Sequence, residues 1–427
     1  MRINVIGAGL AGCEAAYRLA EYGYNVDLYE MKPIKKSPAH HSDNFGELVC
    51  SNSLKAERVA SAAGLMKEEM RKFNSLCMQA ADASKVEAGG ALAVDRDVFS
   101  DFITNVIKNH KNINVINKVV DTITEKPTII ATGPLTDEAL INNINSYCEG
   151  LLHFYDAAAP IVLAESIDME DAFLASRYDK GEGHYINCPM NKDEYELFYE
   201  QLINAERVEL KQFEKGDIYE GCMPIEVMAS RGENTIRFGP LKPVGLINPK
   251  TGHRPWANVQ LRKENKEGTL YNIVGFQTNL KFSEQKRVFS LIPALKNAEF
   301  MRYGVMHRNT FINSPKVLNK NLSVKTKENL FFAGQLTGVE GYMESAMSGI
   351  MAAENLKRYI ENEPALILPN ITMMGALLNY ITDEFVTDFQ PMGANFGILP
   401  TLENNIRNKQ ERYMALAQRS LDWFNKM

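Results

Sequence analysis

No apolar stretch in this 427-residue chain approaches the roughly 20 residues that a membrane-spanning helix needs. The N-terminus, MRINVIGAGLAG, is apolar, but it runs directly into a glycine motif and has no cleavage-site pattern of a secretory signal. With 45% hydrophobic and 23% charged residues, the chain has the composition of a soluble globular protein rather than a disordered one. Its length is too great for one ordinary core, so we expect two or three domains.

The cysteines form no metal-binding or redox pair. Six are present, at positions 13, 50, 77, 148, 188 and 222, and no two have CxxC spacing. This spacing argues against a zinc site and against a dithiol redox motif, so we expect no bound metal. Free thiols in a long chain without a signal sequence indicate a reducing, cytoplasmic location.

Positive charge is scarce over most of the chain but not over one segment. The net charge is −6, yet residues 231–327 hold 18 Lys and Arg against 5 Asp and Glu, and the rest of the chain carries −19. One interpretation of this basic segment is a solvent-exposed surface with no partner. The segment also suits a polyanionic partner, because Lys and Arg neutralise nucleic-acid phosphates.

A dinucleotide-binding motif follows the first predicted strand. Residues 2–6 have the pattern of a buried strand, residues 7–12 are GAGLAG, residues 13–22 predict a helix, and residues 25–30 predict a second strand. In such a unit, GxGxxG lets a pyrophosphate approach the free N–H groups of the helix N-terminus, and an acid after the second strand binds a ribose hydroxyl. The predicted cofactor-binding residues are Gly7, Ala8, Gly9, Leu10, Ala11, Gly12 and Glu30.

Two later apolar segments favour FAD over NAD as the resident dinucleotide. TIIATG ends in Thr132 and Gly133, and NLFFAG ends in Gly334, which Gln335 follows. Two-part flavoprotein domains use such returning strands to cover the flavin. A helix predicted over 342–356 is rich in small residues. Its N-terminus could face the cofactor, or its small residues could serve only close packing.

The order of these segments predicts an α/β fold in which a Rossmann-like FAD-binding domain is split by an inserted α+β domain. Residues 1–145 form its first part, and residues 305–427 return to it and end in helices. The inserted domain, residues 146–304, would face the substrate. It contains strand-like segments at 234–238, 257–261 and 270–276 and a helical stretch near 193–207.

Two cysteines have unusual neighbours. Cys50 lies in LVCSNS, and Cys222 lies in YEGCMPIE, where a preceding glycine and a following proline constrain the chain. A free cysteine is most often a small buried hydrophobe, so packing alone could explain either residue.

Cations interleave with one aromatic residue in the basic segment. Arginine and tryptophan together suit an RNA backbone and an unstacked base, although Trp256 could equally be a core residue. The candidate RNA-binding residues are Arg231, Arg237, Lys242, Arg254, Trp256 and Arg308.

Several longer blocks occur together in one order: HHSDNFGELVCSNSL, YEGCMPIEVMASRG, RFGPLKPVGL, RYGVMHRNTFINSP, FFAGQLTGVEGYMESA and FQPMGANFGILP. With GAGLAGCEAA at the start, they make the chain resemble the TrmFO family of folate- and FAD-dependent tRNA (uracil-5-)-methyltransferases over essentially its whole length. The resemblance implies a FAD domain similar to that of glutathione reductase.

The resemblance also implies a reaction. A one-carbon unit would pass from 5,10-methylenetetrahydrofolate to C5 of uridine 54 in the tRNA T-loop, with FAD as reductant and NAD(P)H regenerating it. Besides tRNA and folate, no membrane and no obligate protein partner is implied. Matched to the family, Cys222 would attack uracil C6, Cys50 would remove the C5 proton beside the flavin, and Tyr342 would lie near flavin and folate.

The chemistry explains why two thiols would be needed. Addition of a thiolate at C6 makes C5 nucleophilic, and a base must then remove the C5 proton. A thiol near its ordinary pKa is mostly protonated at neutral pH, so nearby cations or a helix N-terminus must favour its anion. Two alternatives stay open: a paralogue that methylates a uridine of 23S rRNA by the same chemistry, and an FAD-dependent oxidoreductase acting on a small molecule.

Overall fold

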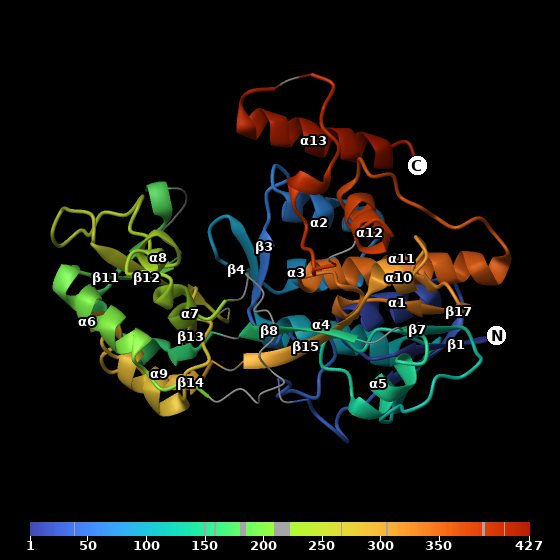
Figure 1. The fold of residues 1–427 in the computed structure, drawn as a ribbon, viewed down its shortest axis with the longest axis horizontal. Coiled ribbons are helices and arrows are strands. Elements are labelled where there is room, and N and C mark those ends of the chain that lie inside the picture. The colour runs from blue at the N-terminus through green and yellow to red at the C-terminus, as the bar shows by residue number, and fades with distance from the viewer. Residues whose placement is uncertain are drawn as a thin grey trace.

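The structure is a computed structural model that describes residues 1–427 except 38, 149–150, 158, 180–184, 209–222, 266, 305, 387–388 and 405. It describes only the backbone of 151–157 and of 307–308. Figure 1 shows two lobes side by side, one built from the two ends of the chain and one from its middle. Among the described residues, no helix is long and apolar enough to cross a membrane.

A six-stranded sheet forms the centre of the first lobe. Its order is β16 (Ser323–Val324), β17 (Lys327–Phe332), β7 (Thr128–Ile130), β1 (Arg2–Ile6), β2 (Asn25–Glu30) and β6 (Ile113–Asn117). All neighbours are parallel except β16 and β17. β7 pairs with β1 on one side and with β17 on the other, so the segment after residue 320 returns to the sheet of the N-terminal strand, as the split fold predicts.

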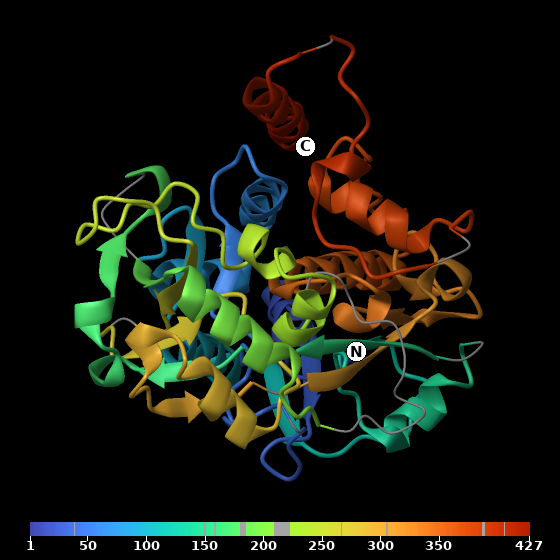
Figure 2. The ribbon, with the colours of Figure 1, turned by 60° about the vertical axis from the view of Figure 1, so that its left-hand side comes forward.

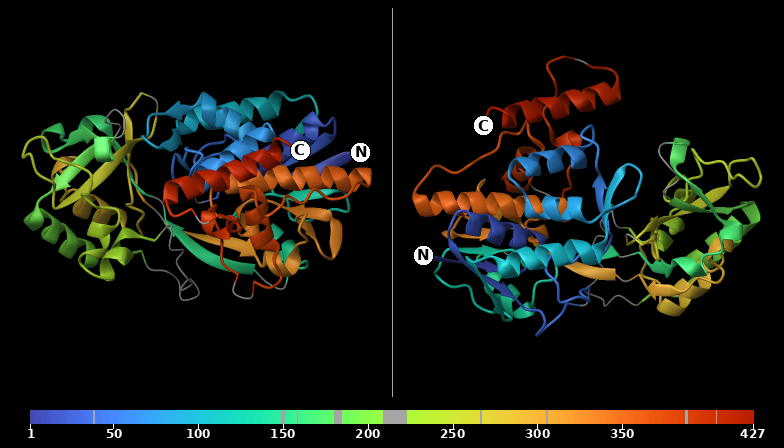
Figure 3. Two further views of the ribbon diagram at one scale, coloured as in Figure 1. Left: turned by 90° about the horizontal axis from the view of Figure 1, so that it is seen from above. Right: turned by 180° about the vertical axis from the view of Figure 1, so that it is seen from behind.

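Helices from both ends of the chain surround this sheet, some against its strands and others in an outer layer. They are α1 (Leu10–Glu21), α2 (Ala62–Lys72), α3 (Leu76–Ala83), α4 (Arg96–Asn109), α5 (Glu138–Ile144), α10 (Ser314–Val317), α11 (Tyr342–Glu361), α12 (Met373–Thr382) and α13 (Lys409–Phe424). In the views of Figure 3, α13 lies on the outside of α2. A small antiparallel sheet of β3 (Ser53–Ala56), β5 (Ala91–Val94) and β4 (Lys85–Val86) stands beside them.

α1 and α11 pack closely. A Cβ atom at Gly349 would lie 2.2 Å from the carbonyl oxygen of Ala11, so only glycine permits this contact. Of the two interpretations of the small residues in α11, close packing is therefore the one this contact supports.

The second lobe has its own core and an antiparallel sheet. The sheet order is β10 (Phe173–Ala175), β11 (Tyr185–Met190), β12 (Ala257–Lys263), β13 (Leu270–Ile273), β9 (Ile161–Leu163) and β14 (Phe300–Arg302). The helices α6 (Lys192–Ile203), α7 (Ile225–Ser230), α8 (Thr235–Phe238) and α9 (Phe282–Phe289) pack with it, and Figure 2 shows them on the near side of this lobe. The antiparallel pair β8 (Leu151–Ala157) and β15 (Met306–Ile312) carries the chain into and out of the lobe.

One predicted element of the inserted domain is wrong. Residues 234–238 were expected to form a strand, but residues 235–238 form the helix α8. The apolar Ile236 and Phe238 alternate as in a strand, yet only Ile236 is buried, while Phe238 is 69% exposed. One buried side chain, that of Ile236, is enough to hold a helix of a single turn, and the helix ends at Gly239. The domain boundaries at 146 and 304 stay a prediction.

Candidate active site

The glycine turn after β1 has the geometry that a dinucleotide needs. Gly7 has φ +100°, and a Cβ atom there would lie 2.6 Å from the carbonyl oxygen of Ala131. A Cβ atom at Gly12 would lie 1.8 Å from the carbonyl oxygen of Gly7, so α1 can cross the strand this closely only at a glycine. A Cβ atom at Gly9 would meet nothing within 4 Å, which leaves room above the first turn of α1 for a pyrophosphate.

Glu30 stands at the end of β2 with its carboxylate directed to this turn. It accepts hydrogen bonds from the backbone N–H of Ala8 at 2.8 Å and of Lys32 at 3.0 Å. These two bonds fix the carboxylate and leave lone pairs that can accept from a ribose hydroxyl. The side chain is 7% exposed and lines a cavity with Gly7, Ala8 and Gly9.

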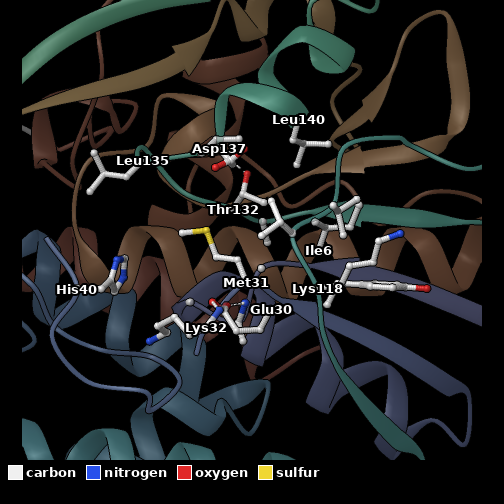
Figure 4. Close-up of a pocket in the computed structure, with 18 of the residues that line it drawn as sticks. Ile6, Glu30, Met31, Lys32, His40, Lys118, Thr132, Leu135, Asp137 and Leu140 are labelled. Carbon is white, nitrogen blue, oxygen red and sulfur yellow. Dashed lines mark hydrogen bonds between the residues drawn. The ribbon is translucent and has the colours of Figure 1, made fainter. Parts of the chain in front are cut away.

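Figure 4 shows this cavity between the glycine turn and α5. Thr132, a predicted cofactor-binding residue, lines it, and its hydroxyl lies 2.6 Å from that of Thr136. Several polar lining residues did not follow from the motif, because they lie outside it, just after Glu30 or in later segments of the chain. These are Lys32, His40, Lys118, Thr136 and Asp137.

The remaining predicted cofactor-binding residues lie either in the buried first turn of α1 or in the segments that follow β7 and β17. Leu10 and Ala11 are buried in the first turn of α1 and belong to the core. Gly133 and Gly334 follow β7 and β17 with φ +71° and +81°, at the same edge of the sheet as Gly7. Gln335 donates a hydrogen bond to Glu340 at 2.7 Å. Contacts of these residues with a cofactor stay a prediction.

Cys50 lies against Tyr342, the first residue of α11. The Tyr342 hydroxyl oxygen accepts hydrogen bonds from the backbone N–H of Cys50 at 2.7 Å and of Ser51 at 3.2 Å, and it lies 3.0 Å from the Cys50 Sγ. Burial, and then the neighbouring Cys50, raise the pKa of Tyr342 well above its ordinary value, so the phenol keeps its proton. Because its oxygen already accepts two bonds, that proton is available to the sulfur.

Three arginines hold the backbone and side chains around Cys50. Arg96 of α4 donates to the carbonyl oxygen of Leu48 at 2.7 Å, and Arg302 of β14 donates to that of Val49. Arg262 of β12 donates to the Ser51 hydroxyl at 2.9 Å and to the Asn52 side-chain oxygen at 3.1 Å. The segment 48–52 is thus held from both lobes.

The other described cysteines are buried, and this burial makes them unsuited to catalysis. Cys13, Cys77, Cys148 and Cys188 are buried, whereas Cys50 is half-buried. Burial raises the pKa of the thiols of Cys13, Cys77 and Cys188, and that of Cys148 to about 12. Cys222, the second predicted catalytic residue, lies outside the described residues.

Of the candidate RNA-binding residues, Arg237, Arg254 and Trp256 lie on the inserted lobe beside the start of β12, at the end of that strand opposite to Arg262. The Arg237 guanidinium lies 3.9 Å from the ring centre of Trp256 and 5.2 Å from that of Phe238. Arg231, Lys242 and Arg254 are exposed. Phe238 was missed because its segment was interpreted as a strand. The side chain of Arg308 lies outside the described part of the chain.

Trp256 and Arg254 also line a groove. Its charged and polar lining includes Arg237, Lys192, Lys250 and His253, together with the acids Glu170, Asp171 and Glu194. It starts beside Trp256, one residue before β12, whereas Arg262 is the sixth residue of that strand. At about 3.3 Å per residue, the groove and the Cys50 segment lie about 20 Å apart along the sheet.

The parallel sheet, the glycine turn and the returning strands define a Rossmann-like protein of the two-part flavoprotein class. Residues 2–364 match the family "Glucose inhibited division protein A". A protein of Listeria monocytogenes serotype 4b (strain F2365), named methylenetetrahydrofolate--tRNA-(uracil-5-)-methyltransferase TrmFO, is 58% identical over 421 residues, or 98% of this chain and 97% of that protein. A protein of the same name from Bacillus pumilus (strain SAFR-032) is also 58% identical, with the same coverage.

The chain therefore belongs to the TrmFO family, within the wider glucose-inhibited division protein A family. The solved structure of Aquifex aeolicus GidA in its form II crystal has the same fold, with a TM-score of 0.72 at 15% identity, covering 100% of this chain and 73% of that one.

Proposed function

We propose that this protein methylates C5 of a uridine in tRNA, uridine 54 of the T-loop, with 5,10-methylenetetrahydrofolate as the one-carbon donor. Full-length relatives at 58% identity carry the corresponding name. The single observation that carries the proposal within the structure is the half-buried thiol of Cys50, held 3.0 Å from the Tyr342 hydroxyl and surrounded by arginines. Since free thiols persist in a reducing compartment, we place the reaction in the cytoplasm.

FAD is the cofactor that fits the cavity beside the glycine turn. The open space at Gly9, the oriented carboxylate of Glu30 and the polar cavity wall would hold the pyrophosphate and the adenosine ribose. When bound and reduced by NAD(P)H, FAD supplies the electrons that convert the transferred carbon to a methyl group. The residues of this chain would bind it and orient it.

Cys50 would act as the base that removes the C5 proton. A base works best when it is already unprotonated at the working pH, and the arginines around Cys50 favour its anion. Tyr342 would hold the thiolate in place by donating a hydrogen bond to it. Cys222 would supply the nucleophile that adds to C6 and makes C5 reactive.

The inserted lobe would hold the RNA. Its exposed cations can neutralise phosphates, and the Arg237–Trp256 pair with the exposed ring of Phe238 offers a platform on which an unpaired base can stack. The target uridine must leave its own stack to reach a site beside Cys50.

A single assay tests the proposal. Purified holoenzyme is given methylenetetrahydrofolate and NADPH with either a tRNA transcript or a 23S rRNA fragment, and the methylated uridine is located by mass spectrometry of nuclease digests. Methylation of tRNA at uridine 54 is expected. Methylation of the rRNA fragment alone would identify the protein as an rRNA-modifying paralogue, and oxidation of NADPH with no RNA product would favour a small-molecule oxidoreductase.

The roles of the two thiols can be separated with RNA that carries 5-fluorouridine. Cys222→Ala should form no covalent adduct with this RNA, because the C6 nucleophile is missing. Cys50→Ala should form the adduct but fail to turn over normal RNA, since only the proton removal is lost. An adduct that persists in Cys222→Ala and disappears in Cys50→Ala would reverse the assignment.

A further inference from the structure

The groups around Cys50 do not balance in charge. Three guanidinium groups surround the segment 48–52, from Arg96, Arg262 and Arg302, and the buried carboxylate paired with one of them is Glu264, at Arg96. Glu47 and Asp97 line a pocket with Arg96 and Arg302, but Glu47 pairs with Lys32 at 3.6 Å and Asp97 is exposed. Glu264 is 4% exposed, and the side chain of its ion-pair partner Arg96 is 14% exposed. Arg262 is 7% exposed.

Such an excess of buried positive charge is unfavourable unless an anion is present. Burial lowers the pKa of Arg262, and burial followed by the charge of Arg96 lowers the pKa of Arg302. Burial also opposes the charge of Arg96, yet Glu264, Tyr342 and Cys50 raise the pKa of that guanidinium above its ordinary value. An arginine keeps its charge under these conditions, so the compensation must come from a neighbouring acid.

Cys50 is the acid at the centre of this arrangement. Among the residues that the structure describes, titratable and charged groups that act on it are Tyr342 from α11, Arg96 from α4, Arg302 from β14, and Arg262 with Glu264 at the end of β12. Tyr342 keeps its proton and directs it to the sulfur, which leaves Cys50 as the group that can lose a proton to solvent and supply the missing negative charge.

We propose that Arg262 and Arg302 of the inserted lobe are positioning residues that hold Cys50 as a thiolate, so that contact between the two lobes sets the acidity of the thiol. Only Arg96 belongs to the lobe that carries Cys50. The inserted lobe supplies the other two cations, and it is tied to the same segment by Asn52, which is fully buried and donates to the carbonyl oxygen of Lys263 at 2.8 Å.

The acidity of Cys50 can be measured without RNA, folate or turnover. The tryptic peptide 37–55 contains Cys50 as its only cysteine, so its alkylation by iodoacetamide is followed by mass spectrometry on the FAD-bound protein over a range of pH. In the wild type, the rate should reach its half-maximum well below the pH of about 8.5 expected for a free thiol. Arg262→Gln and Arg302→Gln should each move this midpoint upward and lower the rate at pH 7 about tenfold.

Two controls separate charge from structure. Arg262→Lys keeps the charge and should restore most of the wild-type midpoint. Lys263→Gln removes a charge one residue further along β12, where the side chain pairs with Glu87 at 3.3 Å, and should leave the midpoint unchanged. Thermal unfolding and flavin content confirm folding, and Arg302 lies on the edge strand β14, where a substitution disturbs the core less than at Arg262.

A midpoint that is unchanged in both glutamine variants would overturn the proposal. An Arg262→Lys midpoint as high as that of Arg262→Gln would also overturn the proposal, because the geometry of the arginine rather than its charge would then set the acidity of Cys50. The inference goes beyond the proposed function, and an experiment can contradict either one without contradicting the other. A protein that methylates no RNA could still show the shifted midpoint, and an active methyltransferase could lack it.

Discussion

The hydroxyl of Tyr342 accepts hydrogen bonds from the backbone N–H groups of both Cys50 and Ser51, and it lies 3.0 Å from the Cys50 Sγ. Tyr342→Phe removes one acceptor and one donor at this point and leaves the ring in place. Hydrogen bonds to charged groups contribute roughly 1.5–3 kcal/mol, so methylation should fall about 10- to 100-fold, and the Cys50 alkylation midpoint should rise. Unchanged flavin absorbance in the variant would show that the cofactor is still bound, and unchanged turnover would contradict the prediction.

Gly9 and Gly12 should respond differently to the same substitution. Gly9 has φ −74°, and a Cβ atom there meets no protein atom within 4 Å, so Gly9→Ala should unfold at the temperature of the wild-type apoprotein. It should nevertheless lose affinity for FAD, because the methyl group takes the space of the pyrophosphate. Gly12→Ala should lower the stability of the apoprotein by roughly 1–3 kcal/mol or more, because its methyl group overlaps the backbone of Gly7. Calorimetry of apoprotein and FAD titration distinguish the two.

Phe238 and Arg237 should contribute to RNA affinity without affecting the cofactor. Stacking of a base on an aromatic ring contributes roughly 1–3 kcal/mol, so Phe238→Ala should weaken tRNA binding about 5- to 100-fold in filter-binding or anisotropy measurements. Arg237→Gln should weaken binding and reduce its salt dependence. Phe385→Ala serves as the matched control, because Phe385 is even more exposed, at 85%, and lies on the other lobe. Equal losses in Phe238→Ala and Phe385→Ala would contradict a specific platform.

Glu69 should make stability depend on pH. It is fully buried in α2, and its carboxylate accepts bonds from the N–H groups of Met373 and Met374 and from the Ser420 hydroxyl. Burial raises its pKa from about 4.5 to about 7. The folded protein therefore binds this proton more tightly than the unfolded chain, and the contribution of Glu69 to stability falls as the pH rises from 4.5 to 7.

Glu69→Gln removes that titration. Its unfolding free energy should be lower than that of the wild type near pH 5, because the amide replaces an acceptor by a donor. The difference should shrink, by up to about 3 kcal/mol, as the pH approaches 8. Urea titrations at several pH values measure this, and a difference that is constant with pH would show that Glu69 does not titrate in this range.

The parts of the site that follow from the sequence are those that one local segment determines. The glycine turn and Glu30 lie within one strand–turn–helix–strand unit, so spacing alone places them, and the structure brings the Glu30 carboxylate to the N–H of Ala8 in that turn. Arg96, Arg262 and Arg302 come from three distant segments, and no pattern along the chain shows that they meet at Cys50. Phe238 was missed for a different reason, because one turn of helix is too short to show a helical period.

The contact between Ala11 and Gly349 also bears on the order in which the protein is made. α1 leaves the ribosome before the inserted lobe, but the surface that covers it emerges only when α11 has been synthesised. The entire inserted lobe, with its separate core, emerges between these two events. On the ribosome, the inserted lobe can therefore fold before the packing of α1 against α11 is complete.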